Sequence, residues 1–300
     1  MRTMPLFLTL ALLVPAAASE RYGEPRKSAV KEEAKKTKAT GHQAAPAAGT
    51  SREAETRLKA LEKENLQLRQ ELAAKSGAAS PVAGAEAATP EGALAELVSG
   101  NGRFVTGART RSQMGFNDAA LRQALAKGQA PFAVIVTCSD SRLADNFIFD
   151  QELGRLFTIR EAGNCPDIQG LASIEYAVEH LGSKVVVVMG HDACGAVKAV
   201  QESGSTALPG NLWSLQSAMA GLLDSVHRKA GESEAQHMAH LVEANAVRQA
   251  GVVMARSSIV QHLCASGKLK VVPAVYDLTT GKVTFLPPVG ADTPKPEAHH

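Results

Sequence analysis

The fold of this sequence can be worked out from one stretch, Phe132-Ala133-Val134-Ile135-Val136-Thr137-Cys138-Ser139-Asp140-Ser141-Arg142. The stretch begins with an apolar run rich in β-branched residues, which predicts a buried strand. A thiol, a carboxylate and a guanidinium then follow at alternate positions, Cys138, Asp140 and Arg142. A second apolar run, Val185-Val186-Val187-Val188-Met189, is followed in the same way by Gly190-His191-Asp192-Ala193-Cys194. We therefore expect two strands that each end in side chains able to bind a metal.

Strand-like and helix-like segments alternate from residue 91 to residue 289, which we take as the folded domain. Further strands are expected at Leu156–Arg160, Val271–Tyr276 and Val283–Phe285. Helices are expected at 93–98, 119–127, 168–181, 194–202, 212–229 and 235–254, and a last one, capped by Ser257 or Ser258, should stop at Gly267. The alternation predicts an α/β fold with a mostly parallel four-stranded sheet, a fifth antiparallel edge strand and helices on both faces. Ligands bind at the carboxyl ends of the strands in such sheets, so Cys138 and His191 should meet there.

Composition excludes two classes of protein. The 300 residues carry a net charge of +2, and the interspersion of Lys and Arg with Asp and Glu is not typical of a nucleic-acid-binding protein. The four cysteines, Cys138, Cys165, Cys194 and Cys264, are too few and too scattered for a disulfide scaffold. A bridge between Cys165 and Cys264 is an alternative in an exported protein, but we expect both to be free, buried thiols.

The N-terminus has the pattern of a signal peptide over residues 1–18. Arg2 precedes an apolar run from Pro5 to Val14, and Ala16 and Ala18 form a small-residue cleavage motif. The run is shorter than the roughly 20 residues that span a bilayer. We therefore expect a periplasmic or otherwise exported protein with no stable membrane insertion after cleavage. An uncleaved membrane anchor is the alternative.

Three segments separate the signal peptide from the folded domain. Residues 19–50 and 76–90 are expected to be linkers, the first of them disordered, because they lack apolar periodicity. Residues 51–75 between them show apolar spacing of three and four, at Leu58, Leu61, Asn65, Leu68 and Leu72. This spacing predicts a short coiled-coil helix in which Asn65 favours a parallel dimer. A single solvated helix is the alternative, and residues 290–300 are expected to form a disordered tail.

Cys138, His191 and Cys194 offer two thiolates and an imidazole, a ligand set that suits zinc. Three protein ligands leave the fourth tetrahedral position for water, as in catalytic zinc sites, although Asp140 could supply a fourth ligand and make the site structural. The simplest alternative is that the cysteines are small buried apolar residues and His191 is a core histidine. The polar residues beside the thiols at both strand ends argue against that alternative.

Asp140 and Arg142 indicate how a water or hydroxide in the fourth position would be used. A guanidinium beside a carboxylate keeps the carboxylate ionised and holds it through two hydrogen bonds. Asp140 would then accept a hydrogen bond from a zinc-bound hydroxide and direct its lone pair toward a substrate. The alternative is a surface ion pair that contributes little to stability.

Motifs spread over the whole domain resemble those of the β-class carbonic anhydrases. They are Cys138-Ser139-Asp140-Ser141-Arg142, Ile148-Phe149-Asp150-Gln151, Ala162-Gly163-Asn164, Ser173-Ile174-Glu175-Tyr176-Ala177-Val178 and Gly190-His191-Asp192-Ala193-Cys194-Gly195-Ala196-Val197. The resemblance implies reversible hydration of carbon dioxide to bicarbonate and a proton. It also implies one zinc ion per subunit on Cys138, His191 and Cys194, with Asp140 and Arg142 as a catalytic dyad.

The resemblance has further implications for the pocket and the assembly. The family's site lies at a dimer interface, so a homodimer or homotetramer is expected, and Asp140 can replace the water on zinc in a closed, inactive state. Gln129 matches a glutamine that borders the substrate pocket in one branch of the family. Ile135 stands where the bicarbonate-gated branch has Trp, which implies the ungated branch. Gly195 is a candidate to donate its backbone N–H to bound bicarbonate.

Two positions depart from the family pattern, and neither is a ligand. Glu161 stands where a neutral residue is usual, and Cys165 stands where an apolar one is typical. Two other functions are alternatives. A hydrolase of another small linear substrate, carbonyl sulfide or carbon disulfide, would keep the same site. A non-enzymatic, zinc-stabilised oligomeric scaffold would have no need of Asp140 and Arg142.

Overall fold

The computed structural model describes residues 56–57, 87–111 and 118–290. The predictions for residues 1–50, 76–86 and 291–300 lie outside the described residues, as does the predicted coiled-coil segment except for Thr56 and Arg57, which are helical. In the part of the chain that the structure describes, no helix is both long enough and apolar enough to cross a membrane.

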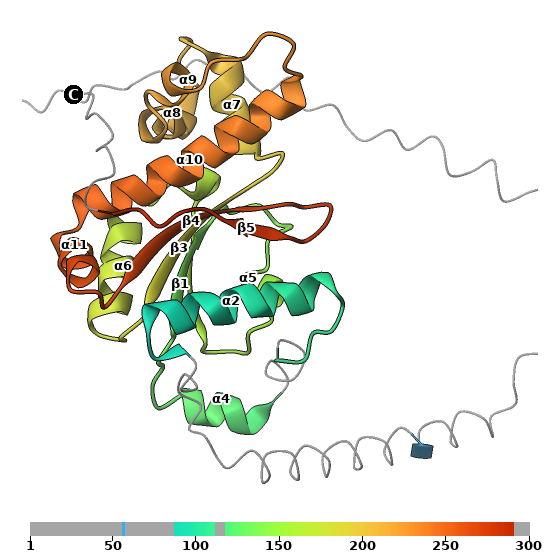
Figure 1. Ribbon diagram of the computed structural model, residues 1–300, viewed down its shortest axis with the longest axis vertical. Coiled ribbons are helices and arrows are strands. Elements are labelled where there is room, and N and C mark those ends of the chain that lie inside the picture. Colours follow the sequence, from blue (N-terminus) through green and yellow to red (C-terminus); the bar gives the residue numbers. More distant parts are fainter. Residues whose placement is uncertain (1–55, 58–86, 112–117, 291–300) are drawn as a thin grey trace, which may run out of the picture. The chain divides into compact units, whose positions relative to one another are not determined.

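One sheet of five strands forms the centre of the domain, in the order β2-β1-β3-β4-β5 (Figure 1). The strands are β1 (Ala133–Thr137), β2 (Leu156–Arg160), β3 (Val185–His191), β4 (Lys270–Tyr276) and β5 (Val283–Phe285). The first four pair in parallel, and β5 pairs antiparallel with β4 at one edge. The predicted sheet is therefore confirmed.

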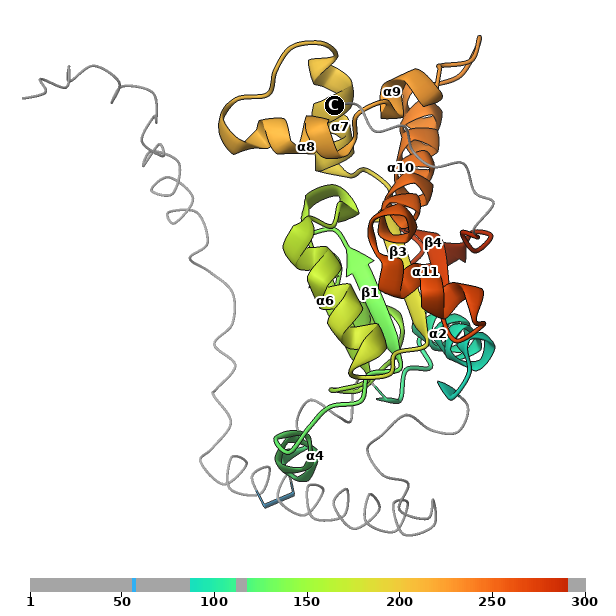
Figure 2. The same ribbon diagram turned by 90° about the vertical axis from the view of Figure 1, so that its left-hand side faces the viewer.

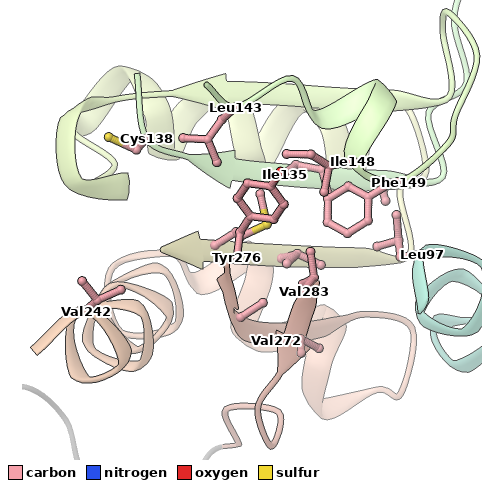
Figure 3. Close-up of a cluster of buried hydrophobic side chains, with 14 of the residues drawn as sticks. Leu97, Ile135, Cys138, Leu143, Ile148, Phe149, Val242, Val272, Tyr276 and Val283 are labelled. Atoms are coloured by element: carbon pink, nitrogen blue, oxygen red, sulfur yellow. The ribbon is translucent and has the colours of Figure 1, made fainter. Parts of the chain in front are cut away.

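Helices cover both faces of this sheet (Figures 1 and 2). The α-helices that the structure describes in this domain are α2 (Pro90–Val105), α4 (Ala119–Leu125), α5 (Asp145–Ile148), α6 (Ile168–Glu179), α7 (Gly195–Ser203), α8 (Trp213–Ala218), α9 (Leu222–Ser225), α10 (Glu234–Arg256) and α11 (Ser258–Ala265). Leu97 of α2 and Phe149 after α5 pack with Ile135 on one face, in the apolar cluster shown in Figure 3. On the other face, α6, α11 and the C-terminal half of α10 pack around residues such as Val134 and Val186.

The last two helices, α10 and α11, begin at serine caps. Ser233 and Gln236 form a capping box at the start of α10, in which each side chain bonds to the other residue's backbone. Ser257 accepts a hydrogen bond from the backbone N–H of Val260, over 3.2 Å, and so caps α11. Of the two serines expected to cap the last helix, Ser257 therefore has that role.

The central strand β3 is buried along its whole length, because it has a strand on each side and helices on both faces. It runs two residues further than expected, since its pairing with β4 continues to His191 and Tyr276. Gly190 lets α10 approach closely, because a Cβ there would lie only 3.2 Å from Val242 Cγ1. His191 is thus the last residue of a buried strand, and the pairing of that strand fixes the position of His191.

The single helix expected at 212–229 is wrong. The chain instead forms a 3-10 turn at Gly210–Leu212 and the two short helices α8 and α9. Gly221, with a left-handed φ of 74°, lies directly before α9. Met219 is 1% exposed and packs against Gly163, where an added Cβ would lie 2.3 Å from Met219 Cε. The burial of Met219 against the loop that contains Gly163 therefore overrides the helical spacing of the leucines around Met219.

Candidate active site

The carboxyl ends of β1 and β3 bring the predicted metal ligands together. Cys138 follows β1, His191 ends β3, and Cys194 is the residue before α7. The ligand atoms of these three residues lie within 4.8 Å of one another, and all three residues are buried. Ala193 adopts a positive φ of 51° in the tight turn between His191 and Cys194. In Figure 3, Cys138 lies at one end of the apolar cluster and Leu97 at the other.

Cys138 is held as a thiolate. Its largest stabilising interaction is a hydrogen bond with Cys194, and together with the nearby His191 imidazole and with backbone N–H groups this bond lowers the pKa of Cys138 to about 4, despite burial. The backbone N–H of Gly163 is one of these donors, 3.4 Å from Cys138 Sγ. The hydrogen bond with Cys138 and burial both raise the pKa of Cys194. The hydrogen bonds around Cys138 therefore favour its thiolate form.

His191 is oriented by the chain that follows it. Its Nδ1 lies 2.8 Å from the carbonyl oxygen of Asp192, which can only accept, so Nδ1 carries a proton. Asp192 is itself fixed, because its carboxylate accepts from the backbone N–H of Leu278 over 2.7 Å. Burial opposes a charge on His191, but the Cys138 thiolate outweighs it and raises the pKa of the imidazole. A proton and a metal therefore compete for Nε2.

The donor set fits zinc. His191 Nε2 is buried and has no hydrogen-bond partner, which is unusual for a buried polar atom. It lies beside the sulfur atoms of Cys138 and Cys194, and zinc binds such N and S ligands in tetrahedral sites. Three protein ligands leave one position open, the arrangement of a catalytic zinc site.

Arg142 holds Asp140 beside the cluster. Its backbone N–H and its Nε each donate to Asp140 Oδ1 over 2.9 Å, and its Nη2 donates to Oδ2 over 2.7 Å. These bonds keep the pKa of Asp140 well below its usual range, so the group is a carboxylate near neutral pH. Asp140 Oδ2 lies 3.9 Å from His191 Nε2, and its side chain is 18% exposed. The carboxylate therefore lies between the buried cluster and the surface.

The sequence did not identify two further residues near the 138–142 segment, Arg160 and Asp145, as site residues. Arg160 donates its Nε to the carbonyl oxygen of Cys138 over 3.3 Å and its Nη2 to that of Asp140 over 2.5 Å. Asp145 is buried at the start of α5, and its Oδ1 has no hydrogen-bond partner. Burial raises the pKa of Asp145 to about 7, against the opposing positive charge of Arg160. No sequence pattern could have identified Asp145, because its burial depends on tertiary packing.

Comparisons with known proteins agree with this geometry. The sequence profile of the family described as carbonic anhydrase matches residues 133–283. Carbonic anhydrase 2 of Mycobacterium tuberculosis is 38% identical over 208 residues, which cover 67% of this chain and 95% of that protein. A carbonic anhydrase of Pseudomonas aeruginosa is 35% identical over 176 residues, which cover 55% of this chain and 78% of that protein. A solved Coccomyxa β-carbonic anhydrase in complex with acetazolamide has a TM-score of 0.52 and 29% identity, covering 65% of this chain and 87% of that one.

This chain belongs to the β-class carbonic anhydrases. It is accordingly a carbonate dehydratase, and zinc is the metal of its family. The residues that could hold the ion are Cys138, His191 and Cys194, the buried cluster described above. The resemblance found in the sequence motifs is thus confirmed by comparisons that cover most of the domain.

The two residues expected to contact substrate lie at opposite ends of β1 in this carbonic anhydrase. Gly195 is exposed and begins α7 directly after Cys194, so it lies beside the metal ligands. Gln129 is exposed and precedes β1, whereas Cys138 follows it. In Figure 2 the β1 arrow points toward α7 and away from α4, the helix before Gln129. A single copy of the chain therefore does not bring Gln129 to the metal ligands.

The two departures from the family pattern flank the loop that contains Gly163. Glu161 accepts a hydrogen bond from the backbone N–H of Asp167 over 2.9 Å, and burial raises its pKa. Cys165 donates its Sγ hydrogen to the carbonyl oxygen of Gly163 over 3.2 Å, and burial raises its pKa to about 12. Cys165 and Cys264 are both free thiols, as expected, but only Cys165 is buried, whereas Cys264 is partly exposed.

Proposed function

We propose that this carbonic anhydrase hydrates carbon dioxide with a nucleophile that Asp140 orients and Arg142 helps to hold in place. The observation that carries the proposal is the position of Asp140, an ionised carboxylate whose Oδ2 lies 3.9 Å from His191 Nε2. Zinc on Cys138, His191 and Cys194 would supply the chemistry, because it makes a water acidic enough to act as a nucleophile near neutral pH.

The Asp140 carboxylate acts only as an acceptor. Its Oδ1 takes two hydrogen bonds from Arg142, whereas its Oδ2 takes one, so Oδ2 retains a free lone pair. A nucleophile that donates a proton to this lone pair has its own lone pair turned away from Asp140 and toward carbon dioxide. Arg142 contributes by keeping the carboxylate ionised and in one orientation.

Gly195 is proposed to bind the product. The N–H groups of Ala196 and Val197, in the first turn of α7, lower the pKa of Cys194 and so face its sulfur. Gly195 comes directly before them and is exposed. Its N–H is placed to donate to a bicarbonate beside the metal, and the N-terminus of a helix favours an anion there.

A second copy of the chain is proposed to complete the pocket. The edge strand β2 is only partly buried, and an edge strand is a ready site for pairing with another chain. Two copies paired along β2 about a twofold axis would run their sheets in opposite directions, which brings the amino end of one sheet toward the carboxyl end of the other. Gln129 would then border the pocket of the partner. Sedimentation should find a dimer or tetramer, and a monomer with full activity would contradict the arrangement.

Export to the periplasm is proposed from residues 1–18. Mass spectrometry of the protein isolated from a bacterial host with a Sec pathway should find a mature chain that begins after Ala18. An intact N-terminus would contradict cleavage at this position.

Stopped-flow hydration of carbon dioxide tests the catalytic proposal. We expect Asp140→Asn to lower kcat/KM by roughly 100-fold in the zinc-loaded protein, as typically found for the loss of one group that acts in the transition state. Zinc content should stay unchanged, because Asp140 lies outside the ligand set. The control is Asp118→Asn, at the start of α4, where asparagine also caps a helix. Unchanged kcat/KM in Asp140→Asn would refute the role of Asp140.

A further inference from the structure

Helix α10 contacts the loop that contains Gly163 through a buried amide side chain. Asn245 is fully buried and donates its Nδ2 to the carbonyl oxygen of Gly163 over 2.8 Å. Gln249, one turn further along, donates its Nε2 to Asn245 Oδ1 and to the carbonyl oxygen of Ala218, each over 3.1 Å. Because Gln249 donates to Asn245, the amide of Asn245 has its oxygen toward Gln249 and its nitrogen toward Gly163.

Gly163 connects this pair of amides to the metal cluster. Its carbonyl accepts from Asn245, while its own N–H donates to Cys138 Sγ over 3.4 Å. Its φ is +68°, a left-handed conformation that favours glycine, and an added Cβ would lie 2.3 Å from Met219 Cε. Glycine has wide backbone freedom, and the direction of its N–H therefore depends on the hydrogen bonds around it.

We propose that Asn245 is a positioning residue of the zinc site, which acts by fixing Gly163 so that the Gly163 N–H is aimed at the Cys138 sulfur. Such an N–H group draws electron density from the thiolate, and groups of this kind tune both the affinity and the electronic properties of a bound metal. Without the Asn245 amide, the Gly163 carbonyl keeps only the weak Cys165 donor, and the loop is free to turn. The inference rests on the metal cluster and on the family assignment, and it is independent of the proposed role of Asp140.

Asn101 provides a matched control. It is also a buried asparagine, and its Nδ2 donates to the carbonyl oxygens of Ile148 over 3.1 Å and Gly281 over 2.9 Å. Its Oδ1 accepts from the backbone N–H of Val283 over 2.8 Å. Loss of either asparagine removes buried hydrogen bonds between separate elements, but only Asn245 reaches a residue that donates to a metal ligand.

The test compares the full-length wild-type protein with Asn245→Leu and Asn101→Leu. One measurement is the rate at which a chelator removes zinc, and the other is the sulfur-to-metal absorption of the cobalt-substituted proteins. We expect Asn245→Leu to release zinc about 10-fold faster and to shift the absorption, since partners of this kind typically change affinity by 10- to 100-fold. Asn101→Leu should match wild type in both measurements, although it too is destabilised.

Neither measurement uses carbon dioxide hydration, so a failed role for Asp140 would leave this test intact. If Asn245→Leu does not fold, Gln249→Met replaces it, because this change keeps Asn245 and removes the donor that orients its amide. A smaller change in the same direction is then expected. Wild-type zinc release and absorption in the folded variant would overturn the proposal, and so would an equal change in Asn101→Leu.

Discussion

The charge cluster around Glu96 of α2 and the metal cluster around Cys138 both contain buried polar side chains, and they differ in whether their atoms are paired. In the α2 charge cluster, Glu96 Oε1 accepts hydrogen bonds from Arg103 over 3.1 Å, Arg111 over 2.7 Å and Gln151 over 2.9 Å. Asp150 is fully buried and accepts from Arg103 Nε over 2.6 Å. Each acidic group of this cluster thus has a donor, and the cluster joins α2 to the segment after α5.

The metal cluster at the carboxyl ends of β1 and β3 is different. His191 Nε2 is buried without a hydrogen-bond partner, and Cys138 is a thiolate. Asp140 is held by Arg142 but keeps a lone pair on Oδ2. The comparison teaches that a paired polar cluster stabilises the fold, whereas an unpaired one retains the capacity to bind a metal and act on a substrate.

Removal of a metal ligand should have the largest effect. We expect His191→Ala to lose zinc and to lower carbon dioxide hydration by more than about 1000-fold, because the ion supplies the nucleophile. Zinc content by elemental analysis and stopped-flow rates would measure this loss. A variant with a full complement of zinc and near wild-type rates would show that the unpaired Nε2 is not a ligand.

Asp145→Asn should change stability in a pH-dependent way. The pKa of Asp145 is about 7 in the folded chain and about 3.9 in the unfolded chain. Between these two pH values the folded chain therefore binds the proton of Asp145 more tightly than the unfolded chain does. Stability therefore falls as pH rises from about 4 to 7, by up to about 4 kcal/mol at 1.36 kcal/mol per pKa unit. Asparagine does not ionise, so urea unfolding should find the variant near wild type at pH 4 and more stable at pH 8. An equal difference at both pH values would contradict a buried, neutral Asp145.

Glu96→Gln should break the paired cluster without affecting the metal. Loss of the charge weakens the acceptor that Arg103 and Arg111 share, while Arg103 keeps Asp150, so we expect a cost of up to about 3 kcal/mol of unfolding free energy, the scale for buried ion pairs. Zinc content and kcat should stay at wild-type values. Glu243→Gln, at an exposed position on α10, is the control and should change stability little. Loss of zinc from Glu96→Gln would mean that the two clusters are coupled.

Arg142→Lys should have the smallest effect of these variants. Lysine keeps the positive charge beside Asp140 but replaces a planar, two-point contact with a single point charge. We expect kcat to fall about 10-fold, while zinc content and fold stay unchanged. Arg122→Lys, on the exposed face of α4, is the control. A wild-type rate in Arg142→Lys would show that charge alone, without orientation, is sufficient.

The strands and the candidate metal cluster could be predicted from the sequence because their signals are local. The β-branched run before Cys138 and the run before His191 each indicate a buried strand, and parallel strands end at the same edge of a sheet. The Asp140–Arg142 pair was visible as well, since the two residues are adjacent in one turn. The structure places all five of these side chains at one end of the sheet.

The remaining features depend on contacts between distant segments. The break after α8 follows from the packing of Met219 against Gly163, which are far apart in the sequence. Asn245 is one polar position within the helix predicted at 235–254, and its contact with Gly163 exists only once α10 packs against that loop. Gln129 matched a family motif, but a single chain places it at the amino end of β1. Sequence patterns locate elements and motifs, whereas these contacts arise from packing.

X-ray absorption at the zinc edge would test the central claim most directly, namely that the unpaired cluster is a catalytic zinc site. For the zinc-loaded wild-type protein we predict two sulfur ligands at about 2.3 Å, together with two lighter ligands at about 2.0–2.1 Å. One of the lighter ligands is His191, and it should disappear from the spectrum of any zinc that remains in His191→Ala. A zinc shell with no sulfur, or with four sulfur ligands, would contradict the account.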